Sequence, residues 1–480
     1  MDSIISVASQ PEGRRDSKAV GPISGSSTRM LCLNHFVLAR SYRGLISIPK
    51  RGATDTIRIF LAETPCGQHL KIRGGFRVYK EIVIVGAVRT PFGRYCGALK
   101  EFDYYDLGAL PIRELLVRAH LPGDAIDELW WGVGDTSVCK DVYTPVAARQ
   151  TLLKAGLPAE TPSVSLDKAC VSAMSAVHYG CRAIAAGEIQ TAIAGGATSF
   201  SQEPLIVRGL RWKGFRMGNV AMEDPLLALG YKDFNPVSVD SDNVAAEHGI
   251  FREEQDAWAL RSHRNYGRAW DDGKFSDEMM PIEIPQKGGE PKILDIDEQF
   301  RRDVTMEKLA ALPGIYGCKG ITAGNAPGLN DGSAALLFMT RTKAKDLGLE
   351  PLAEIVAMTS VAILPNRLPE APAKAIRKVL DLTDLTLDDI KLIEINEAFA
   401  AVPLVSTLLL AGNDKTKAEA IRAKTNVNGS AIATGHPNTA SGARLIMNLM
   451  YELRRLGGGY ALAAICGGLA QGDACVLKVS

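Results

Sequence analysis

The sequence predicts an α/β fold built from two similar halves with an inserted lobe. Short apolar runs that read as buried strands alternate with stretches of helical periodicity, which is typical of layered α/β proteins. The surroundings of Cys170 recur around His436, 266 residues further on, which indicates a duplicated unit. Residues 202–326 differ in residue pattern from the flanking sequence and interrupt the first half.

Each half combines strands with small-residue helices. In the first half we expect the strands 82–86, 128–134 and 191–194 and the helices 107–120 and 171–186. Gly187 can end the second of these helices, because glycine readily adopts the left-handed conformation found at helix C-termini. In the second half we expect the strands 392–395 and 462–465 and the helix 440–456. Residues 388–393 also resemble residues 124–129, which supports the duplication.

Four segments follow from these patterns. Residues 1–77 are interpreted as an extension, 78–201 with 327–346 as the N-terminal half, 202–326 as the inserted lobe, and 347–480 as the C-terminal half. The lobe contains a basic stretch followed by an acidic helical segment, 252–274. The basic residues either meet the phosphates of a large anionic substrate or form an ordinary solvated face. They are Arg208, Arg211, Lys213 and Arg216.

The composition argues against several classes of function. With 480 residues, 46% hydrophobic and 23% charged, the chain has the composition of a soluble globular protein. A net charge of +1 does not suggest a nucleic-acid partner, and no apolar run approaches the length of about 18 residues that a membrane span needs. Nine cysteines form no CxxC pair and the seven histidines are dispersed, so no metal site is expected.

Residues 1–77 mix Ser, Gly, Arg and Lys without regular periodicity or an apolar signal region. Many arginines against few acids is typical of an organelle transit peptide, but a disordered extension and upstream sequence translated from a misplaced start stay open. The odd cysteine count without a secretion signal favours a reducing compartment. We therefore expect a cytoplasmic protein, or one of the mitochondrial matrix if this segment is a transit peptide.

Two residues have the context of a nucleophile and its base. Cys170 lies where a loop becomes a helix, and the positive end of the helix dipole is expected to favour a thiolate and lower the thiol pKa. The alternative is a small buried cysteine on an apolar helix. His436 lies between Gly435 and Pro437, which restrict the backbone so that the imidazole projects rigidly, as a general base requires.

Two further residues end apolar strands. Cys466 follows the strand 462–465 and Asn396 follows 392–395, at the edge where α/β sheets usually bind ligands. A cysteine there suits a second acid and base, and the asparagine amide can hold a water that donates to a developing oxyanion. Together with Cys170 and His436, they indicate acyl transfer at sulfur.

The chain resembles the thiolase family, which comprises acetyl-CoA acetyltransferases and 3-ketoacyl-CoA thiolases. The resemblance runs from about residue 80 to 480 and rests on four motifs in order. These are Asp167-Lys-Ala-Cys170-Val-Ser-Ala-Met, Asn396-Glu-Ala-Phe399, Gly435-His436-Pro437 and Cys466-Gly-Gly468. It implies a five-layered αβαβα fold of two similar halves, an inserted loop domain that covers CoA, and a homodimer or homotetramer. It implies CoA as a substrate, ping-pong kinetics and no bound cofactor or metal.

The resemblance also implies a role for each residue. His436 takes the proton of Cys170, which attacks the 3-oxo carbonyl of a 3-oxoacyl-CoA and becomes acylated. Cys466 protonates the departing carbanion, or removes that proton in the synthetic direction. One oxyanion hole would consist of His436 and a water on Asn396, and the other of the backbone N–H groups of Cys170 and Gly468.

Several positions expected near the acyl chain and pantetheine depart from the family's pattern, while the four chemical residues are retained. The departures suggest an acyl group that is branched, aromatic or carboxylated. They also leave open a non-catalytic subunit that needs an accessory partner; a related condensing synthase is disfavoured by the presence of Cys466. The expected substrate contacts are Ser238, Val239, Pro327, Ala398, Phe399, Asn438 and Leu469.

Overall fold

The computed structural model describes residues 81–134, 146–207, 209–227, 231 and 233–480, and four short strands nearer the N-terminus. Those strands form two separate antiparallel pairs, β1 (Met30–Leu33) with β2 (Phe36–Ala39) and β3 (Ile46–Pro49) with β4 (Thr56–Ile59). They belong to one compact unit, Met1–Phe76, and the rest of the chain forms a second, Arg77–Ser480. The remainder of the predicted extension lies outside the described residues.

The second unit contains one ten-stranded mixed sheet. Its strands follow the order β14-β15-β16-β13-β5-β12-β9-β7-β8, and the short β6 also pairs with β12. The strands are β5 (Ile82–Arg89), β6 (Gly93–Arg94), β7 (Glu128–Gly132), β8 (Ser163–Leu166), β9 (Thr191–Thr198), β12 (Asn330–Thr340), β13 (Ala353–Ala362), β14 (Ile390–Ile395), β15 (Gly459–Gly467) and β16 (Gln471–Val479).

The two halves of this sheet share four strands with the same pattern of directions, and the first half has β8 as an additional edge strand. In the first half β7 is parallel to β9, β9 is antiparallel to β12, and β12 is antiparallel to β5. In the second half β14 is parallel to β15, β15 is antiparallel to β16, and β16 is antiparallel to β13. The repeated pattern of directions supports a duplicated unit. The copies differ between the last two strands: a short turn, Gly468–Ala470, joins β15 to β16, whereas residues 199–329 separate β9 from β12.

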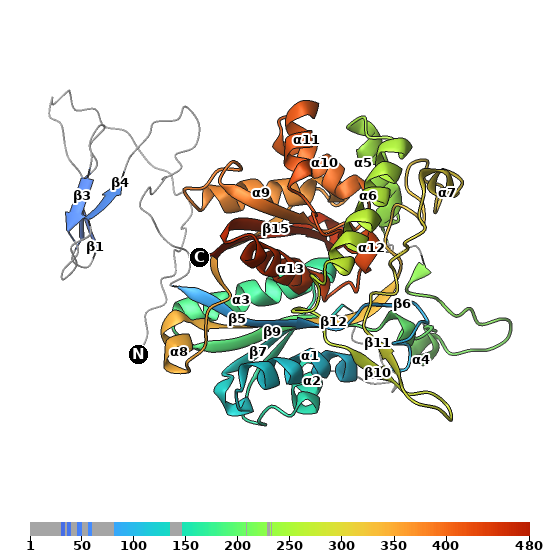
Figure 1. Ribbon diagram of the computed structural model, residues 1–480, viewed down its shortest axis with the longest axis horizontal. Helices are drawn as coiled ribbons and strands as arrows, with labels where there is room; N and C mark the ends of the chain where they lie inside the picture. The colour runs from blue at the N-terminus through green and yellow to red at the C-terminus, as the bar shows by residue number, and fades with distance from the viewer. Residues whose placement is uncertain are drawn as a thin grey trace, which may run out of the picture. The chain divides into compact units, whose positions relative to one another are not determined.

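The two half-sheets are hydrogen-bonded to each other over a short stretch only and separate beyond it. β5 pairs with β13 through Ile82–Ile84 and Ala353–Ile355. Beyond this joint, α3 (Ser172–Ala186) and α13 (Ser441–Arg455) lie between the two half-sheets and pack against each other (Figure 1). The outer faces are covered by α1 (Tyr104–Ala119) and α2 (Ala147–Ala155) on one side, and by α9 (Ala371–Asp381) and α10 (Ala401–Leu410) on the other. The result is five alternating layers of helix and sheet.

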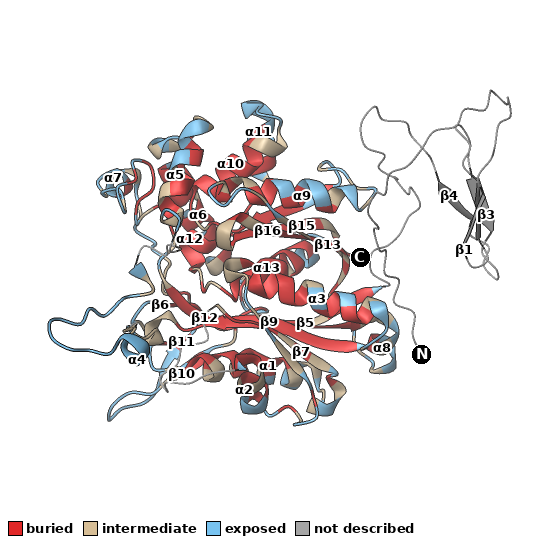
Figure 2. Cartoon of the chain, turned by 180° about the vertical axis from the view of Figure 1, so that it is seen from behind, coloured by how far each residue is buried: buried red, intermediate tan, exposed pale blue. Residues whose placement is uncertain are grey.

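Small residues allow the two central helices to approach closely. A Cβ atom at Gly442 of α13 would lie 2.5 Å from the backbone nitrogen of Met174 in α3. Ala173, Ala440 and Ala443 are fully buried at the same contact. This packing explains why both helices read as runs of Ala, Ser and Gly, and most residues of the two helices are buried (Figure 2).

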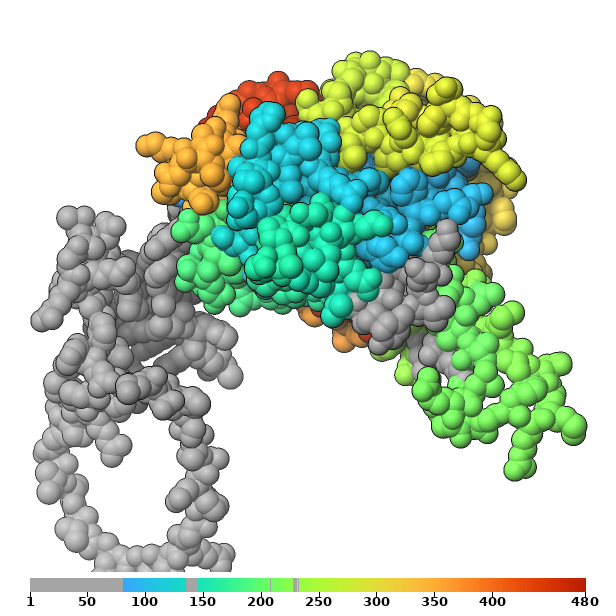
Figure 3. Space-filling view, turned by 90° about the horizontal axis from the view of Figure 1, so that it is seen from below, coloured from blue at the N-terminus to red at the C-terminus, as the bar shows by residue number. Residues whose placement is uncertain are grey.

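The connection between β9 and β12 forms the inserted lobe. It contains α4 (Leu210–Lys213), α5 (Val237–Glu247), α6 (Arg252–Asp271), β10 (Ile282–Ile284), β11 (Lys292–Leu294) and α7 (Met306–Ala310). The long α6 packs on α12 (Ala431–Thr434) of the second half, whereas the segment around α4 projects from the body (Figure 3). Arg211, Lys213 and Arg216 lie exposed on that segment, and Arg208 lies outside the described residues. None of the described helices is long and apolar enough to cross a membrane.

Most predicted elements occur within a few residues of their expected bounds, and the main exception is β9. We expected this strand to end at residue 194, but it continues to Thr198. A Cβ atom at Gly195 would lie 2.0 Å from the carbonyl oxygen of Ala334, so glycine permits the close approach of β12 rather than ending the strand. The domain boundaries at residues 201, 326 and 346 stay predictions.

Candidate active site

One cavity of about 760 Å³ brings residues of both halves and the lobe together. Cys170 from the first half lies on its wall with His436 and Cys466 from the second half. The lobe contributes Tyr231 and the N-terminal end of α5. The cavity lies where β15 ends and where α3 and α13 begin, so segments far apart in the sequence meet there.

A tight turn presents Cys170 to the cavity. The residue lies in a 3₁₀ turn, Ala169–Val171, directly before α3, and Ala169 has a φ of 52°. The Lys168 N–H donates to Ser172 Oγ at 2.8 Å, and the Ala169 N–H donates to Asp167 Oδ1 at 2.9 Å. These bonds hold the turn on both sides of the thiol.

His436 is oriented by the groups around its ring. Its Nε2 lies 3.2 Å from Cys170 Sγ, and its Nδ1 lies 2.6 Å from Ser441 Oγ. The Ser441 hydroxyl donates to the Pro437 carbonyl at 3.1 Å, so its oxygen accepts from Nδ1–H. Nε2 therefore keeps its lone pair toward the thiol. The backbone N–H donates to Asn330 Oδ1 at 2.9 Å and holds the loop in place.

Asn396 lies behind this pair and is fully buried at the end of β14. Its Nδ2 lies 3.4 Å from His436 Nε2. Its Oδ1 accepts from Arg444 Nη2 at 3.1 Å. The amide N–H groups therefore face the histidine, where they can donate to a hydrogen-bond acceptor.

Burial sets the protonation states of the pair. It raises the pKa of the Cys170 thiol to about 12, and burial with the positive charge of Arg444 lowers the pKa of His436 to about 3. Both shifts favour the neutral thiol and neutral imidazole in the free protein. The expectation that the helix N-terminus lowers the Cys170 pKa is therefore wrong for this site, because desolvation outweighs the dipole.

Cys466 faces the same cavity from the end of β15. Its side chain is fully buried, and burial and the neighbouring Cys170 raise its thiol pKa well above the usual value. Cys466 thus lines the cavity at the end of its strand, the edge of the sheet where the sequence placed it. The next two glycines bring the backbone close to the nucleophile turn: the Gly468 N–H donates a long 3.4 Å bond to the Lys168 carbonyl.

Most of the expected substrate contacts lie on the cavity wall. These are Ser238, Pro327, Ala398, Phe399, Asn438 and Leu469. Val239 does not; it packs against the hydrophobic core of the second half. Asn438 Oδ1 is buried and has no hydrogen-bond partner.

Part of the cavity wall is aromatic, which no sequence motif indicated. Tyr104, Phe200, Tyr231 and Tyr316 line the cavity from four different segments. Burial and the nearby Cys170 raise the pKa of Tyr231 to about 12, so its hydroxyl stays protonated. Nothing in the local pattern around these residues distinguishes them from core aromatics, so only the fold identifies them. Glu397, by contrast, is held entirely by structural contacts with Trp258, Ser262, Asn426 and the Ile432 N–H.

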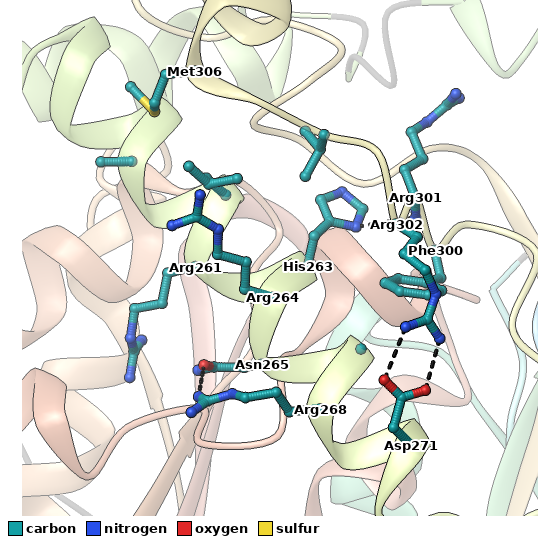
Figure 4. A pocket seen from close by; sticks show the side chains of 14 residues that line it. Arg261, His263, Arg264, Asn265, Arg268, Asp271, Phe300, Arg301, Arg302 and Met306 are labelled. Atoms are coloured by element: carbon teal, nitrogen blue, oxygen red, sulfur yellow. Dashed lines mark hydrogen bonds and ion pairs between the residues drawn. The ribbon is translucent and has the colours of Figure 1, made fainter.

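A second cavity, of about 740 Å³, lies between α6 and residues 300–306 and shares no lining residue with the first (Figure 4). Arginines dominate its polar lining, and its one carboxylate, Asp271, is held by both terminal nitrogens of Arg302 at 2.8 Å. His263 accepts from the Arg301 N–H, and burial lowers its pKa to about 4. It contains no nucleophile. Among the described residues, no group of three or more His, Cys, Asp or Glu side chains is arranged to hold a metal ion.

Comparison with known proteins identifies the family. The model of the thiolase N-terminal domain matches residues 82–342, and that of the thiolase C-terminal domain matches residues 349–479. The chain belongs to the thiolase family. As a thiolase it is an acyltransferase, and the five-layered arrangement of its two halves is the fold of that family.

Individual relatives cover nearly the whole of the second unit. This thiolase is 40% identical over 400 residues to a probable acetyl-CoA acetyltransferase of Mycolicibacterium smegmatis, covering 82% of this chain and 100% of the relative. It is 39% identical over 413 residues to a β-ketoadipyl-CoA thiolase of Acinetobacter baylyi, covering 83% and 99%. The crystal structure of human mitochondrial 3-ketoacyl-CoA thiolase is similar with a TM-score of 0.78 and 35% identity, covering 84% of this chain and 99% of that one. A structure of that human enzyme in complex with CoA has a TM-score of 0.77, with 34% identity and coverage of 84% and 98%.

Proposed function

We propose that this thiolase cleaves a 3-oxoacyl-CoA with CoA, or catalyses the reverse condensation, through an acyl-Cys170 intermediate. The observation that carries the proposal is the 3.2 Å contact between Cys170 Sγ and His436 Nε2 in a cavity that also contains Cys466. A thiol beside a base with a second thiol near it is the set of groups that thiolysis needs. No bound cofactor or metal takes part in this chemistry.

In the first half-reaction, Cys170 Sγ attacks the 3-oxo carbon while its proton passes to His436 Nε2. The carbonyl π electrons move to oxygen, and their return breaks the C2–C3 bond and leaves the electron pair on C2 of the acyl-CoA product. Cys466 protonates that carbon. In the second half-reaction, the CoA thiol attacks the acyl-Cys170 thioester and its proton restores the Cys466 thiol, while Cys170 leaves and takes its proton back from His436. Because the resting pair is neutral, attack and proton transfer occur together.

Two sets of donors would stabilise the oxyanions. The Asn396 amide and His436 face one position, where a water on Asn396 would donate to the thioester oxygen. The backbone N–H groups of Cys170 and Gly468 would serve the other. The long Gly468 bond to Lys168 supports this assignment, since a stronger acceptor than a neutral carbonyl can replace it.

The cavity wall supports an acyl group larger than acetyl. Aromatic residues from four segments line the cavity, and Asn438 presents an amide oxygen without a partner. A branched or aromatic acyl chain would fill the apolar part, and a carboxylated chain carries a polar end that Asn438 could bind. The relatives span both acetyl-CoA acetyltransferases and a β-ketoadipyl-CoA thiolase.

We further propose that the thiolase assembles as a homodimer or homotetramer. The projecting segment of the lobe supports this, because it exposes many large apolar side chains, which soluble monomers rarely do. They are Leu205, Leu210, Trp212, Phe215, Met217, Val220, Met222 and Leu227. Light scattering after size exclusion would test the assembly: Trp212→Glu with Met217→Glu should lower the mass, whereas Leu364→Glu, an exposed position elsewhere, should not. An unchanged mass for the lobe variant would contradict this role of the segment.

Mass spectrometry of the cysteine peptides tests the reaction. After incubation with an acyl-CoA, the peptide containing Cys170 should gain the acyl mass and become protected from alkylation, and added CoA should remove the label. Cys96 is exposed and provides an internal reference. Thiolytic cleavage should be assayed over linear, branched, aromatic and dicarboxylic 3-oxoacyl-CoAs. Full cleavage activity in Cys170→Ala would overturn the mechanism, and no acylation by any substrate in the panel would favour a partner-dependent, non-catalytic subunit.

A further inference from the structure

We propose that Arg444, anchored by Glu394, is a positioning residue that sets the orientation of the Asn396 amide toward His436. This inference rests on the proposed thiolase reaction, in which that amide holds the oxyanion water. It concerns three buried side chains of the second half, contributed by α13 and β14.

Arg444 reaches from α13 to the adjacent strand. It is 1% exposed; its Nη1 donates to Glu394 Oε1 at 2.5 Å and to Ser430 Oγ at 3.0 Å, and its Nη2 donates to Asn396 Oδ1 at 3.1 Å. Glu394 lies in β14 and Asn396 directly follows that strand; the two residues are two positions apart, so they lie on the same side of the extended chain. One planar guanidinium therefore spans both.

The guanidinium determines which way the amide points. Arginine has donors only, so the atom of Asn396 that faces it must be the carbonyl oxygen. Nδ2 then faces His436 Nε2 at 3.4 Å and donates in that direction. In the opposite orientation, the NH₂ group would face the N–H donors of Arg444, and the oxygen would face the lone pair of the base. Both contacts would be repulsive.

Nothing else among the described residues provides this control. The Asn396 backbone N–H donates to the Ala464 carbonyl at 3.0 Å, which fixes the main chain but not the amide. The only recorded hydrogen bonds of the side chain are those with Arg444 and His436. The Nε of Arg444 is buried without a partner, so the guanidinium is held by its two terminal nitrogens alone. An unsatisfied buried donor is costly, which indicates that the remaining contacts have a function beyond packing.

The anchoring carboxylate has an unusual environment that fits this role. Glu394 is fully buried against the same guanidinium. Burial raises its pKa to about 7, although the positive charge of Arg444 lowers it. Its contribution is geometric: it accepts from one terminal nitrogen of the guanidinium, so that the other terminal nitrogen meets Asn396. A glutamine of the same shape can accept the same bond.

The test uses kcat and KM of thiolytic cleavage for Arg444→Met, Arg444→Lys and Glu394→Gln. Arg444→Met should lower kcat about tenfold or more with KM changed less than about twofold, because the loss falls on oxyanion stabilisation and not on binding. Lysine cannot span two acceptors with a planar fork, so Arg444→Lys should restore only part of the rate. Glu394→Gln should keep most of it.

A double-mutant cycle separates positioning from stability. If Arg444 acts through Asn396, adding Arg444→Met to Asn396→Ala should change kcat less than about twofold. Arg89→Lys is the matched control, since Arg89 is equally buried and bonded to Asp297 and Glu278 away from the cavity. It should lower the melting temperature while the kcat of the folded protein is unchanged.

Three outcomes would overturn the inference. The first is an equal decrease in kcat from Arg444→Met with and without the Asn396 side chain. The others are a KM effect as large as the kcat effect, and a decrease in kcat no greater than that of Arg89→Lys. Should Arg444→Met not fold, the same cycle is run with Arg444→Lys. Acylation of Cys170 in the wild type is measured alongside. If the wild type forms no acyl-Cys170, the proposed function itself fails; if it does and the cycle is additive, only the role of Arg444 fails.

Discussion

Replacing His436 with glutamine should separate two reactions of Cys170 that a preformed thiolate would link. Alkylation by iodoacetamide depends on the thiolate present in the free protein, whereas acylation by a CoA thioester needs a base during attack. If the resting pair is neutral, His436→Gln should leave alkylation nearly unchanged. It should lower acylation by about 10²-fold to 10⁴-fold, the usual contribution of a general base.

The structure shows which state of the pair is favoured. Forming a thiolate with a pKa of about 12 next to an imidazolium with a pKa of about 3 costs about 12 kcal/mol at about 1.4 kcal/mol per pKa unit. Attraction between the two charges at 3.2 Å returns only about 5 kcal/mol at an effective dielectric constant of about 20. The difference favours the neutral pair by about 7 kcal/mol.

Alkylation should be followed by mass spectrometry of the Cys170 peptide between pH 6 and pH 10, with the exposed Cys96 as reference. The Cys170 rate should rise continuously over this range without a plateau, because burial raises its thiol pKa to about 12. A plateau for Cys170 below about pH 8, lost in His436→Gln, would refute the neutral pair and show a thiolate–imidazolium pair in the free enzyme.

Three further predictions concern other parts of the molecule. Cys466→Ala should reduce carbon–carbon cleavage at least about 10²-fold but leave the exchange of label between acyl-CoA and CoA unchanged. The exchange needs only acyl-Cys170 and no carbanion, so loss of both reactions would contradict this role of Cys466. Asn438→Leu removes a buried amide oxygen without a partner, so it should raise stability by about 1 kcal/mol in thermal melts and lower cleavage of polar acyl-CoAs relative to linear ones; an unchanged preference would exclude Asn438 from the acyl site. Gly442→Ala should cost about 1–3 kcal/mol in denaturant titrations because its Cβ would lie 2.5 Å from a backbone nitrogen of α3, whereas Gly289→Ala, where the nearest atom is 4.0 Å away, should change little.

The sequence predicted the chemical residues better than it predicted their environment. Glycine and proline around His436, and the strand ends before Asn396 and Cys466, are local signals, and the four residues do converge in the fold. The predicted direction of the Cys170 pKa shift was wrong. The local signal, a helix N-terminus, is opposed by desolvation from residues distant in sequence. Ser238 lines the cavity and the adjacent Val239 packs on the core, a difference that depends on the orientation of α5 and not on local sequence.

The duplication explains how the cavity arises. α3 and α13 occupy equivalent places in the two halves. α3 leads into β9, which is parallel to β7, and α13 leads into β15, which is parallel to β14; Cys170 and His436 lie just before these helices. Because the helices pack side by side in the middle layer, their N-terminal ends meet, and so do the thiol and its base. The copies then diverge at the next connection. In the second half a short turn brings Cys466 and Gly468 onto the wall, and in the first half the inserted lobe brings Tyr231 and α5 over it. Repetition thus accounts for the meeting of nucleophile and base, and the unequal connections account for the second thiol and the acyl-binding wall.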